Sequence, residues 1–313
     1  MLKFFLTCIL FLNLYAIDEL KPTNTLLTTG DVQDIKYKDN LLYAGTSNGT
    51  VEVFDTSTNE KINTIKIPEI KDFMGDTIAS KIYSIDIIDN KILIVSQGMK
   101  GYRNIFIYEN NNLKKVIDID KKYYIQKAYF INNKEIVFAL LSNQIGVYDI
   151  ETKKLKYLIQ ISSSSFSDFV ISEDKQTLIT TDESGIVRKL NIKKGNITKE
   201  FKAVNLDRVY QLDYKNDVIL TAGQDRKAVV YTDNSIYNLD FDFLLYSCGL
   251  SQNAKVGAIA YNEESDVLIF NTKTKEYLYK LTGQEATITK ILFKNENEVF
   301  VSSESNKINY FKF

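Results

Sequence analysis

The chain has 313 residues, and its 39 lysines and arginines are balanced by 40 aspartates and glutamates. This balance gives no electrostatic case for a nucleic-acid partner. The sequence contains no histidine and no tryptophan, which excludes imidazole bases, Ser-His-Asp and Cys-His nucleophiles, and most designs of zinc, copper or iron site.

Residues 1–16 have the pattern of a secretory signal peptide. Lys3 supplies a short positive region, Phe4–Leu14 is an apolar run, and Ala16 offers a small residue for cleavage. The apolar run is shorter than the ~20 residues that span a bilayer. We therefore predict cleavage after about Ala16, export and no stable membrane insertion, with a retained anchor as the alternative. Cys8 resembles a lipoprotein signal only weakly, because the charged region before it is too short.

Beyond residue 16, one pattern occurs seven times: short apolar strands that end in an aromatic residue or Leu, often followed by Asp or Asn. The residues at these ends, here called anchors, are Phe54, Tyr108, Tyr148, Leu190, Tyr231, Phe270 and Phe311. Successive anchors are 54, 40, 42, 41, 39 and 41 residues apart. A period of about 40–45 residues with several strands per unit is typical of a β-propeller blade. We predict an all-β, seven-bladed propeller that occupies residues 17–313 as a single domain.

The fourth unit shows the expected layout of a blade. Its strand-like runs are Phe169–Ile171, Thr177–Thr181 and Ile186–Leu190, and a fourth strand should follow each anchor. Four dipeptides are expected to supply positive φ for tight hairpin turns: Asp39-Asn40, Asn48-Gly49, Asn132-Asn133 and Ser184-Gly185. Residues 67–81 form the longest segment between blades and account for the 54-residue gap.

The two ends of the chain are predicted to close the ring. The last unit stops at Phe313, directly after its third strand, so it lacks an outer strand. Residues 25–30 resemble residues 279–283, the outer strand of the preceding unit. We expect this N-terminal strand to complete the last blade, which leaves no open blade at the seam.

Cys248 would be the sole cysteine after cleavage at residue 16, so no intramolecular disulfide is expected. It lies in the apolar run Leu244–Leu250. Free cysteine is among the most often buried residues. A reactive thiol would need a base beside it, and none is evident. We interpret Cys248 as a small core residue.

The remaining chemical groups are carboxylates, tyrosines, lysines and one thiol. No glycine-rich phosphate loop and no Asp-rich calcium loop is present in the sequence. The acidic pairs Asp182-Glu183 and Glu263-Glu264 have the oxygen ligands that Ca²⁺ prefers, but we interpret them as solvated turns. The sequence therefore predicts a protein that is not an enzyme and that carries no cofactor and no metal.

The first candidate for partner binding is the segment Lys71–Asp76 in the long inter-blade loop. It places Phe73 and Met74 between the charged residues Asp72 and Asp76. Aromatic residues and Met are enriched at protein interfaces. We expect this loop to contact a protein, with packing between blades as the alternative role of Phe73 and Met74.

Two further groups of candidates belong to the same face of the predicted ring. The turn Gln97–Arg103 combines glycines, cations and an aromatic residue, and its candidates are Lys100, Tyr102 and Arg103. In the fifth blade and the loop before it, the candidates are Arg208, Asp225 and Arg226. Arginine is a frequent anchor of interfaces, although an Asp–Arg pair within one hairpin commonly just stabilises the turn.

In period and layout the chain resembles the WD40-type propellers. The family's Gly-His and Trp-Asp pairs are absent; the corresponding positions hold Phe54-Asp55, Tyr148-Asp149, Leu190-Asn191 and Phe270-Asn271. The buried Asp-His-Ser-Trp network of that family therefore cannot form. We expect apolar packing to provide the stability of the blades.

A closer resemblance is to the NapL family of accessory propellers, which are encoded with the periplasmic nitrate reductases of ε-proteobacteria. The segments that carry it are Lys71–Asp76, Ala139–Asn143, Ser165–Phe169, Gly223–Arg226, and Phe243–Tyr246 with Leu250-Ser251. The resemblance covers essentially the whole chain. It implies a periplasmic, non-catalytic helper of nitrate reduction, acting in maturation or electron delivery. Its partners would be nitrate reductase subunits or their maturation factors.

Two other functions stay open. A small-ligand or metal-binding propeller enzyme, lactonase-like or quinone-dependent, would need carboxylates clustered at the central channel. The missing histidine and tryptophan argue against it. A propeller resembling the lipoprotein partner of outer-membrane barrel insertion would need a true lipobox cysteine, and Cys8 is a poor candidate. We therefore favour a docking scaffold that contacts its partner through inter-blade loops.

Overall fold

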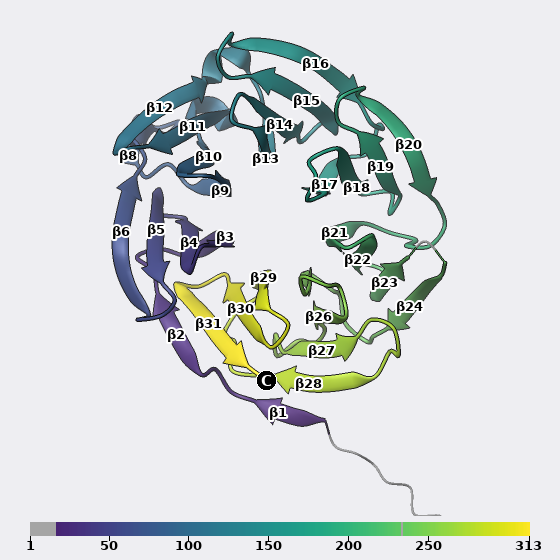
Figure 1. Cartoon of the computed structure of the whole chain (residues 1–313). Coiled ribbons are helices and arrows are strands. Elements are labelled where there is room, and N and C mark those ends of the chain that lie inside the picture. Colours follow the sequence, from purple (N-terminus) through teal and green to yellow (C-terminus); the bar gives the residue numbers. More distant parts are fainter. Residues whose placement is uncertain (1–16, 233) are drawn as a thin grey trace, which may run out of the picture.

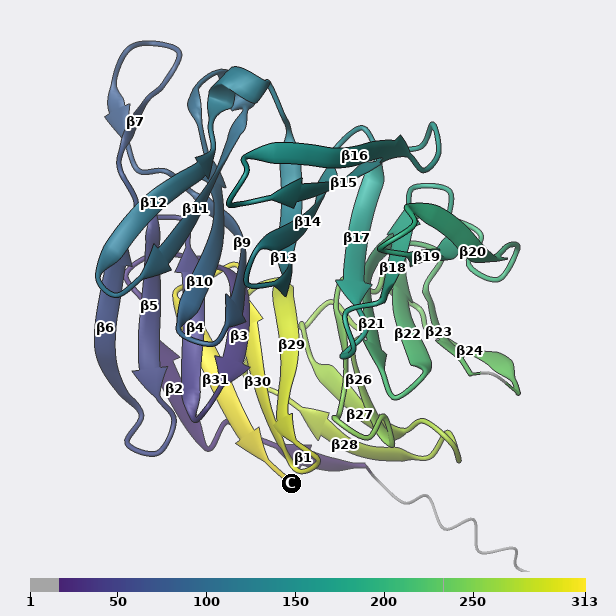
Figure 2. The same ribbon diagram turned by 45° about the horizontal axis from the view of Figure 1, so that its top comes forward.

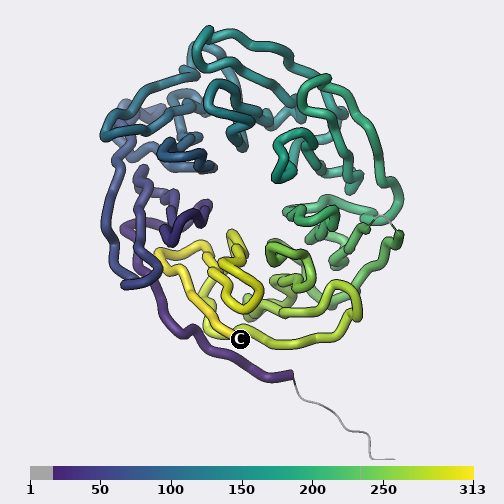
Figure 3. The backbone as a smooth tube through the Cα atoms, viewed as in Figure 1, coloured from purple at the N-terminus to yellow at the C-terminus, as the bar shows by residue number. Residues whose placement is uncertain are grey.

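Seven β-sheets are arranged like blades around a central channel (Figure 1). The structure, a computed structural model, describes residues 17–232 and 234–313. Within these ranges the chain runs once around the ring, and its two ends meet in neighbouring blades (Figure 3). The predicted seven-bladed propeller is confirmed. The predicted signal peptide, residues 1–16, lies outside the described residues.

The blades are numbered from the first complete one, and their strands run from the channel outward. Blade 1 holds β3 (Val32–Lys38), β4 (Leu41–Thr46), β5 (Thr50–Asp55) and β6 (Glu60–Lys66); blade 2 holds β9 (Ile82–Ile88), β10 (Lys91–Gln97), β11 (Arg103–Glu109) and β12 (Asn112–Ile117). Blade 3 holds β13 (Ile125–Asn132), β14 (Glu135–Leu140), β15 (Gln144–Asp149) and β16 (Lys154–Gln160); blade 4 holds β17 (Phe166–Ile171), β18 (Thr177–Asp182), β19 (Val187–Asn191) and β20 (Asn196–Phe201). Blade 5 holds β21 (Val209–Lys215), β22 (Val218–Gly223), β23 (Lys227–Tyr231) and β24 (Ile236–Asp240); blade 6 holds β25 (Cys248–Leu250), β26 (Val256–Ala260), β27 (Val267–Asn271), β28 (Tyr277–Leu281) and the added β1 (Asp18–Leu20). Blade 7 holds β29 (Ile288–Asn295), β30 (Glu298–Ser303), β31 (Lys307–Lys312) and β2 (Asn24–Leu27), while β7 (Ile70–Lys71), β8 (Thr77–Ile78) and the 3₁₀ turns η1 (Met99–Gly101) and η2 (Ile119–Lys121) lie in loops.

The burial of each strand follows its place in the blade. Second and third strands are covered on both faces by the adjacent blades, so they are nearly continuously apolar. Outer strands face solvent and carry lysines, as in β20. The anchors end the third strands inside the core: Phe54, Tyr231, Phe270 and Phe311 are at most 2% exposed. The repeating aromatic pattern in the sequence is thus the pattern of the contacts between blades.

The chain ends close the ring as the sequence predicts. Strand β2 pairs antiparallel with β31, with Leu26 opposite Ile308, and it completes blade 7. Strand β1 adds a contact that the sequence did not predict, because it pairs in parallel with β28 of blade 6. The N-terminal segment therefore spans the junction between blades 6 and 7 (Figure 1).

Three of the four predicted positive-φ turns are confirmed. Gly49 and Gly185 have φ of 71° and 74°, and Asp39 and Asn40 have φ of 51° and 63°. The prediction for Asn132-Asn133 is wrong, since neither residue has positive φ. There β13 bulges before Asn132, and the Asn132 side chain accepts a hydrogen bond from the amide of Lys134 at 2.8 Å. An Asx turn thus replaces the tight hairpin turn.

The expectation that blade stability rests on apolar packing alone is wrong. In blade 4, Asp182 is fully buried and accepts hydrogen bonds from Asn143 at 2.9 Å and Ser162 at 2.8 Å. The Arg188 guanidinium pairs with the same carboxylate at 2.6 Å. This network ties the turns of blades 3 and 4 together without histidine or tryptophan.

A second buried network lies in blade 1. Glu52 is fully buried and accepts hydrogen bonds from the amide of Thr29 at 2.9 Å and from Lys61 at 2.5 Å. A buried charge needs partners. In these two networks the partners of the buried carboxylates are Asn, Ser, Thr, Lys and Arg side chains and backbone amides. The expected burial of Cys248 is confirmed, and burial raises the pKa of its thiol.

Candidate docking face and central channel

The long inter-blade segment forms a small hairpin, β7–β8, that stands out from the ring (Figure 2). It belongs to the face that carries the loops between blades and the turns between second and third strands, here called the loop face. At its tip Phe73 is 101% exposed and Met74 is 80% exposed. Both side chains are thus free of the contacts between blades that sequence analysis left as their alternative role.

The two aspartates of this segment shape the tip. The amide of Asp72 donates to the carbonyl of Asp76 at 2.9 Å, and the amide of Asp76 donates to the Asp72 carboxylate at 2.9 Å. Gly75 adopts a φ of 91°, which an L side chain rarely does. The turn is therefore held by its own hydrogen bonds, and it presents Phe73 and Met74 in a defined place.

The second group of candidates lies in the turn between β10 and β11 of blade 2, the blade that follows this hairpin in the chain. Lys100 is exposed with a φ of 58°. Tyr102 packs on Tyr124, with 5.0 Å between ring centres. The Arg103 guanidinium lies 3.9 Å from the ring centre of Tyr83, and its burial lowers its pKa. Of the three, Lys100 is the most accessible, while Arg103 chiefly supports the loop.

Three exposed apolar residues of the loop face were not predicted as contacts. Met99, Tyr124 and Leu141 are 39%, 43% and 46% exposed, and the amide of Leu141 donates to the carbonyl of Tyr124 at 2.9 Å. The available signal was Leu141, an apolar residue placed directly after a strand where a polar turn was due.

The candidates of blades 4 and 5 lie on the loop face but across the ring from the hairpin (Figure 1). Asp225 accepts a hydrogen bond from the amide of Leu206 at 2.8 Å and so fixes the loop between these blades. Arg208 pairs with Glu183 at 3.5 Å, and Arg226 is exposed with a φ of 63°. The structure thus divides the predicted residues into two groups on one face.

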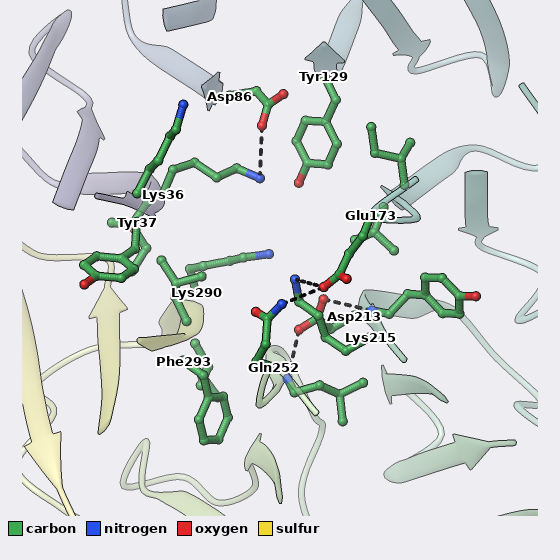
Figure 4. A pocket seen from close by; sticks show the side chains of 18 of the residues that line it. Lys36, Tyr37, Asp86, Tyr129, Glu173, Asp213, Lys215, Gln252, Lys290 and Phe293 are labelled. Carbon is green, nitrogen blue, oxygen red and sulfur yellow. Dashed lines mark hydrogen bonds and ion pairs between the residues drawn. The ribbon is translucent and has the colours of Figure 1, made fainter. Parts of the chain in front are cut away.

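The inner strands line a central channel with a cavity at each mouth. The cavity at the loop face measures about 210 Å³ and the one at the opposite face about 550 Å³. The larger cavity is lined by the C-terminal ends of the inner strands, and Figure 4 shows its side chains. Lys36, Tyr129 and Lys290 point into it from blades 1, 3 and 7.

Aspartates of the channel connect neighbouring blades at four of the seven junctions. The amides of Ile85, Phe130, Leu212 and Leu250 donate, in that order, to Asp34 at 2.9 Å, Asp86 at 2.8 Å, Asp168 at 3.1 Å and Asp213 at 2.9 Å. Each carboxylate belongs to one inner strand and each amide to the inner strand of the following blade. These carboxylates are therefore part of the framework of the ring.

The enzyme alternative needed carboxylates grouped around a metal. Over residues 17–232 and 234–313, no group of three or more His, Cys, Asp or Glu side chains is placed to hold a metal ion. The Lys127 ammonium instead pairs with Asp168 at 2.7 Å. In the same way, the Lys36 ammonium lies 3.7 Å from Asp86. Cations and anions therefore alternate along the channel wall.

Fold and channel together define a seven-bladed β-propeller. The chain is similar to the β-propeller domain of Cps50 (Swd1) from Myceliophteria thermophila, with a TM-score of 0.77 and 13% identity over 93% of this chain and 99% of that chain. At this identity the likeness shows the fold alone. No family model and no curated protein matches the sequence. Among the described residues, no helix has the length and apolar character to cross a membrane.

Proposed function

We propose that this protein is a non-catalytic docking scaffold whose loop face binds a protein partner through the β7–β8 hairpin. The observation that carries the proposal is the exposure of Phe73 and Met74, 101% and 80%, at the tip of a turn held by its own hydrogen bonds. Two large apolar side chains in this position gain nothing from folding and are available for a partner.

Physical chemistry favours this hairpin as an anchor. Burial of one large apolar side chain is worth roughly 1.5–3 kcal/mol, and a few such residues dominate most interfaces. Because the turn is organised before binding, little ordering entropy is lost on association. Met99, Tyr124 and Leu141 extend the apolar surface over blades 2 and 3, so one partner contacts several loops.

The partner and the compartment are part of the same proposal. The resemblance to the NapL family supports a periplasmic protein that assists nitrate reduction, bound to nitrate reductase subunits or their maturation factors. Two of the segments that carry this resemblance, residues 71–76 and 223–226, lie on the loop face. Export after cleavage near Ala16 would place the scaffold in the same compartment as these partners.

The test is a binding measurement with the purified protein and purified periplasmic nitrate reductase subunits and maturation factors. Replacement of Phe73 and Met74 by Ala should weaken binding at least about tenfold, which corresponds to ~1.4 kcal/mol, while the melting temperature stays unchanged. Ile62→Ala is the matched control, since Ile62 is 55% exposed on the outer strand β6.

Two results would contradict the docking role of the hairpin. A double variant that loses melting temperature and binding together would mean that Phe73 and Met74 stabilise the ring. Equal weakening by Ile62→Ala would mean that general exposed apolar surface, and not the hairpin, carries the contact. Binding of none of these proteins, with a positive capture of others, would remove the nitrate reductase context while leaving the scaffold.

A further inference from the structure

The larger mouth of the channel, on the face opposite the loop face, is rich in positive charge. Its wall includes the lysines Lys36, Lys38, Lys175, Lys215, Lys290 and Lys294 against the acids Asp86, Glu173 and Asp213. A cavity of about 550 Å³ lies within the range of small-molecule sites. The chain as a whole is nearly neutral, so this local excess of cations is a property of the site.

Three of the ammonium groups converge on the centre of the cavity (Figure 4). Lys36 comes from blade 1, Lys215 from blade 5 and Lys290 from blade 7. Lys36 lies 3.7 Å from Asp86, and Lys215 lies 4.0 Å from Glu173. Within the described part of the chain, the Lys290 ammonium makes no ion pair and no hydrogen bond.

The acids of the wall are engaged by other donors. Asp86 accepts the amide of Phe130 at 2.8 Å, and Asp213 accepts the amide of Leu250 at 2.9 Å. Glu173 accepts the side-chain amide of Gln252 at 2.8 Å. Asp86 and Glu173 are thus each shared between a hydrogen-bond donor and a lysine at 3.7 Å and 4.0 Å, so the lysine charges are only partly neutralised. Cations in a partly desolvated cavity favour a bound anion.

Tyr129 adds a hydroxyl to this group. The centre of its ring lies 3.8 Å from the Lys36 ammonium nitrogen. Its hydroxyl points toward the cavity (Figure 4). Among the described residues the hydroxyl has no hydrogen-bond partner. Burial raises the pKa of Tyr129, but the charges of Lys127, Lys36 and Lys290 outweigh this effect and lower it. A phenol in such a field is a good donor to an anion.

We propose that this cavity binds a small molecule with two or more anionic groups, either phosphates or carboxylates. One anionic group occupies the space between Lys36, Lys290 and the Tyr129 hydroxyl, and a second reaches Lys215 across the channel. A multivalent anion is required because the ammonium groups come from three different blades. This site lies on the opposite face from the proposed protein contact, and it is independent of the docking function.

The experiment measures binding by calorimetry and melting temperature with three probes: pyrophosphate, citrate and inorganic phosphate, at ionic strength matched with sodium chloride. We expect pyrophosphate or citrate to bind and to raise the melting temperature more than inorganic phosphate does. The preference between pyrophosphate and citrate identifies the anionic group. Lys290→Met should weaken binding at least tenfold, and Tyr129→Phe severalfold.

Lys114→Met is the matched control, because Lys114 is an exposed lysine on the outer strand β12 of blade 2, and it should leave binding unchanged. If Lys290→Met fails to fold by circular dichroism, Lys290→Gln takes its place. The proposal is overturned if no probe exceeds the sodium chloride reference. It is also overturned if the Lys290 variants bind like the wild type, or if Lys114→Met weakens binding equally, which would indicate non-specific association with surface lysines.

Discussion

Glu298 shows how one side chain joins the last blade to the end of the chain. It begins β30 and pairs with Lys294 at 3.1 Å and with Lys312 at 3.3 Å. Burial raises the pKa of Glu298, but the hydrogen bonds from Tyr310, Lys294 and Lys312 outweigh it and bring the pKa to about 2. Lysines of the inner strand β29 and of the third strand β31 thus hold a carboxylate of β30 in its charged form and link three strands of blade 7.

This arrangement predicts a defined pH dependence of stability. A carboxylate with a pKa lowered from 4.5 to about 2 stabilises the fold above pH 4.5, and its contribution is lost as the pH falls toward 2. Glu298→Gln should lower the free energy of unfolding at pH 7 by about 1–2 kcal/mol, allowing for solvent screening. It should also flatten the decline between pH 4.5 and 2. Urea unfolding at pH 7, 4.5 and 3 measures both effects, and parallel curves for the two proteins would show that Glu298 is not the responsible group.

At the scale of elements, the sequence predicted those strands whose apolar pattern is set by the neighbouring blades. The third strands and their anchors are apolar because they are covered on both faces, and Leu26 of β2 was found through its likeness to another outer strand. Strand β1 could not be predicted, because Asp18-Glu19-Leu20 has only one apolar residue. Its pairing is also remote in sequence, since Glu19 lies opposite Lys280, 261 positions away. The two-residue strands β7 and β8 are too short to show any periodicity.

The closing strand β2 offers a test with neighbouring residues on opposite faces. Leu26 is 3% exposed in the core, and Leu27 beside it is 56% exposed. Leu26→Asp buries an unpaired charge and removes apolar contacts at the seam, so it should cost about 3–5 kcal/mol of stability. Leu27→Asp should change stability by less than about 0.5 kcal/mol. Thermal and urea unfolding would compare them, and equal losses would show that β2 is not held by its apolar face.

At the scale of the whole molecule, the blade layout predicted that the candidates lie on one face. It did not predict that they form two groups on opposite sides of the ring. Phe73 and Arg226 were both assigned correctly to the loop face, yet blades 1 and 5 lie across the ring from each other. The lysine cavity was not predicted at all. Lys36 and Lys290 each lie in an ordinary strand of mixed apolar and polar residues, and only closure of the ring brings their side chains to one mouth. Sites made by inner strands depend on the number of blades and are therefore invisible to local patterns.

The aspartates between inner strands make a prediction about the ring as a unit. Asp34 is 7% exposed and accepts the amide of Ile85 from the next blade at 2.9 Å. Asp34→Leu leaves that buried amide without an acceptor, a loss of about 1–3 kcal/mol, whereas Asp34→Asn keeps a side-chain oxygen in place. Hydrogen exchange at Ile85 should therefore become about ten- to a hundredfold faster in Asp34→Leu, and change little in Asp34→Asn.

The position of the faster exchange decides how the blades are coupled. If the aspartate acts as a local latch between blades 1 and 2, amides of β22 in blade 5 keep their wild-type exchange rates, since each blade contacts only its neighbours. Uniformly faster exchange around the ring would contradict the latch and mean that the closed ring opens in one step. Because β2 joins the two chain ends in blade 7, Leu26→Asp provides the comparison in which the seam itself is opened.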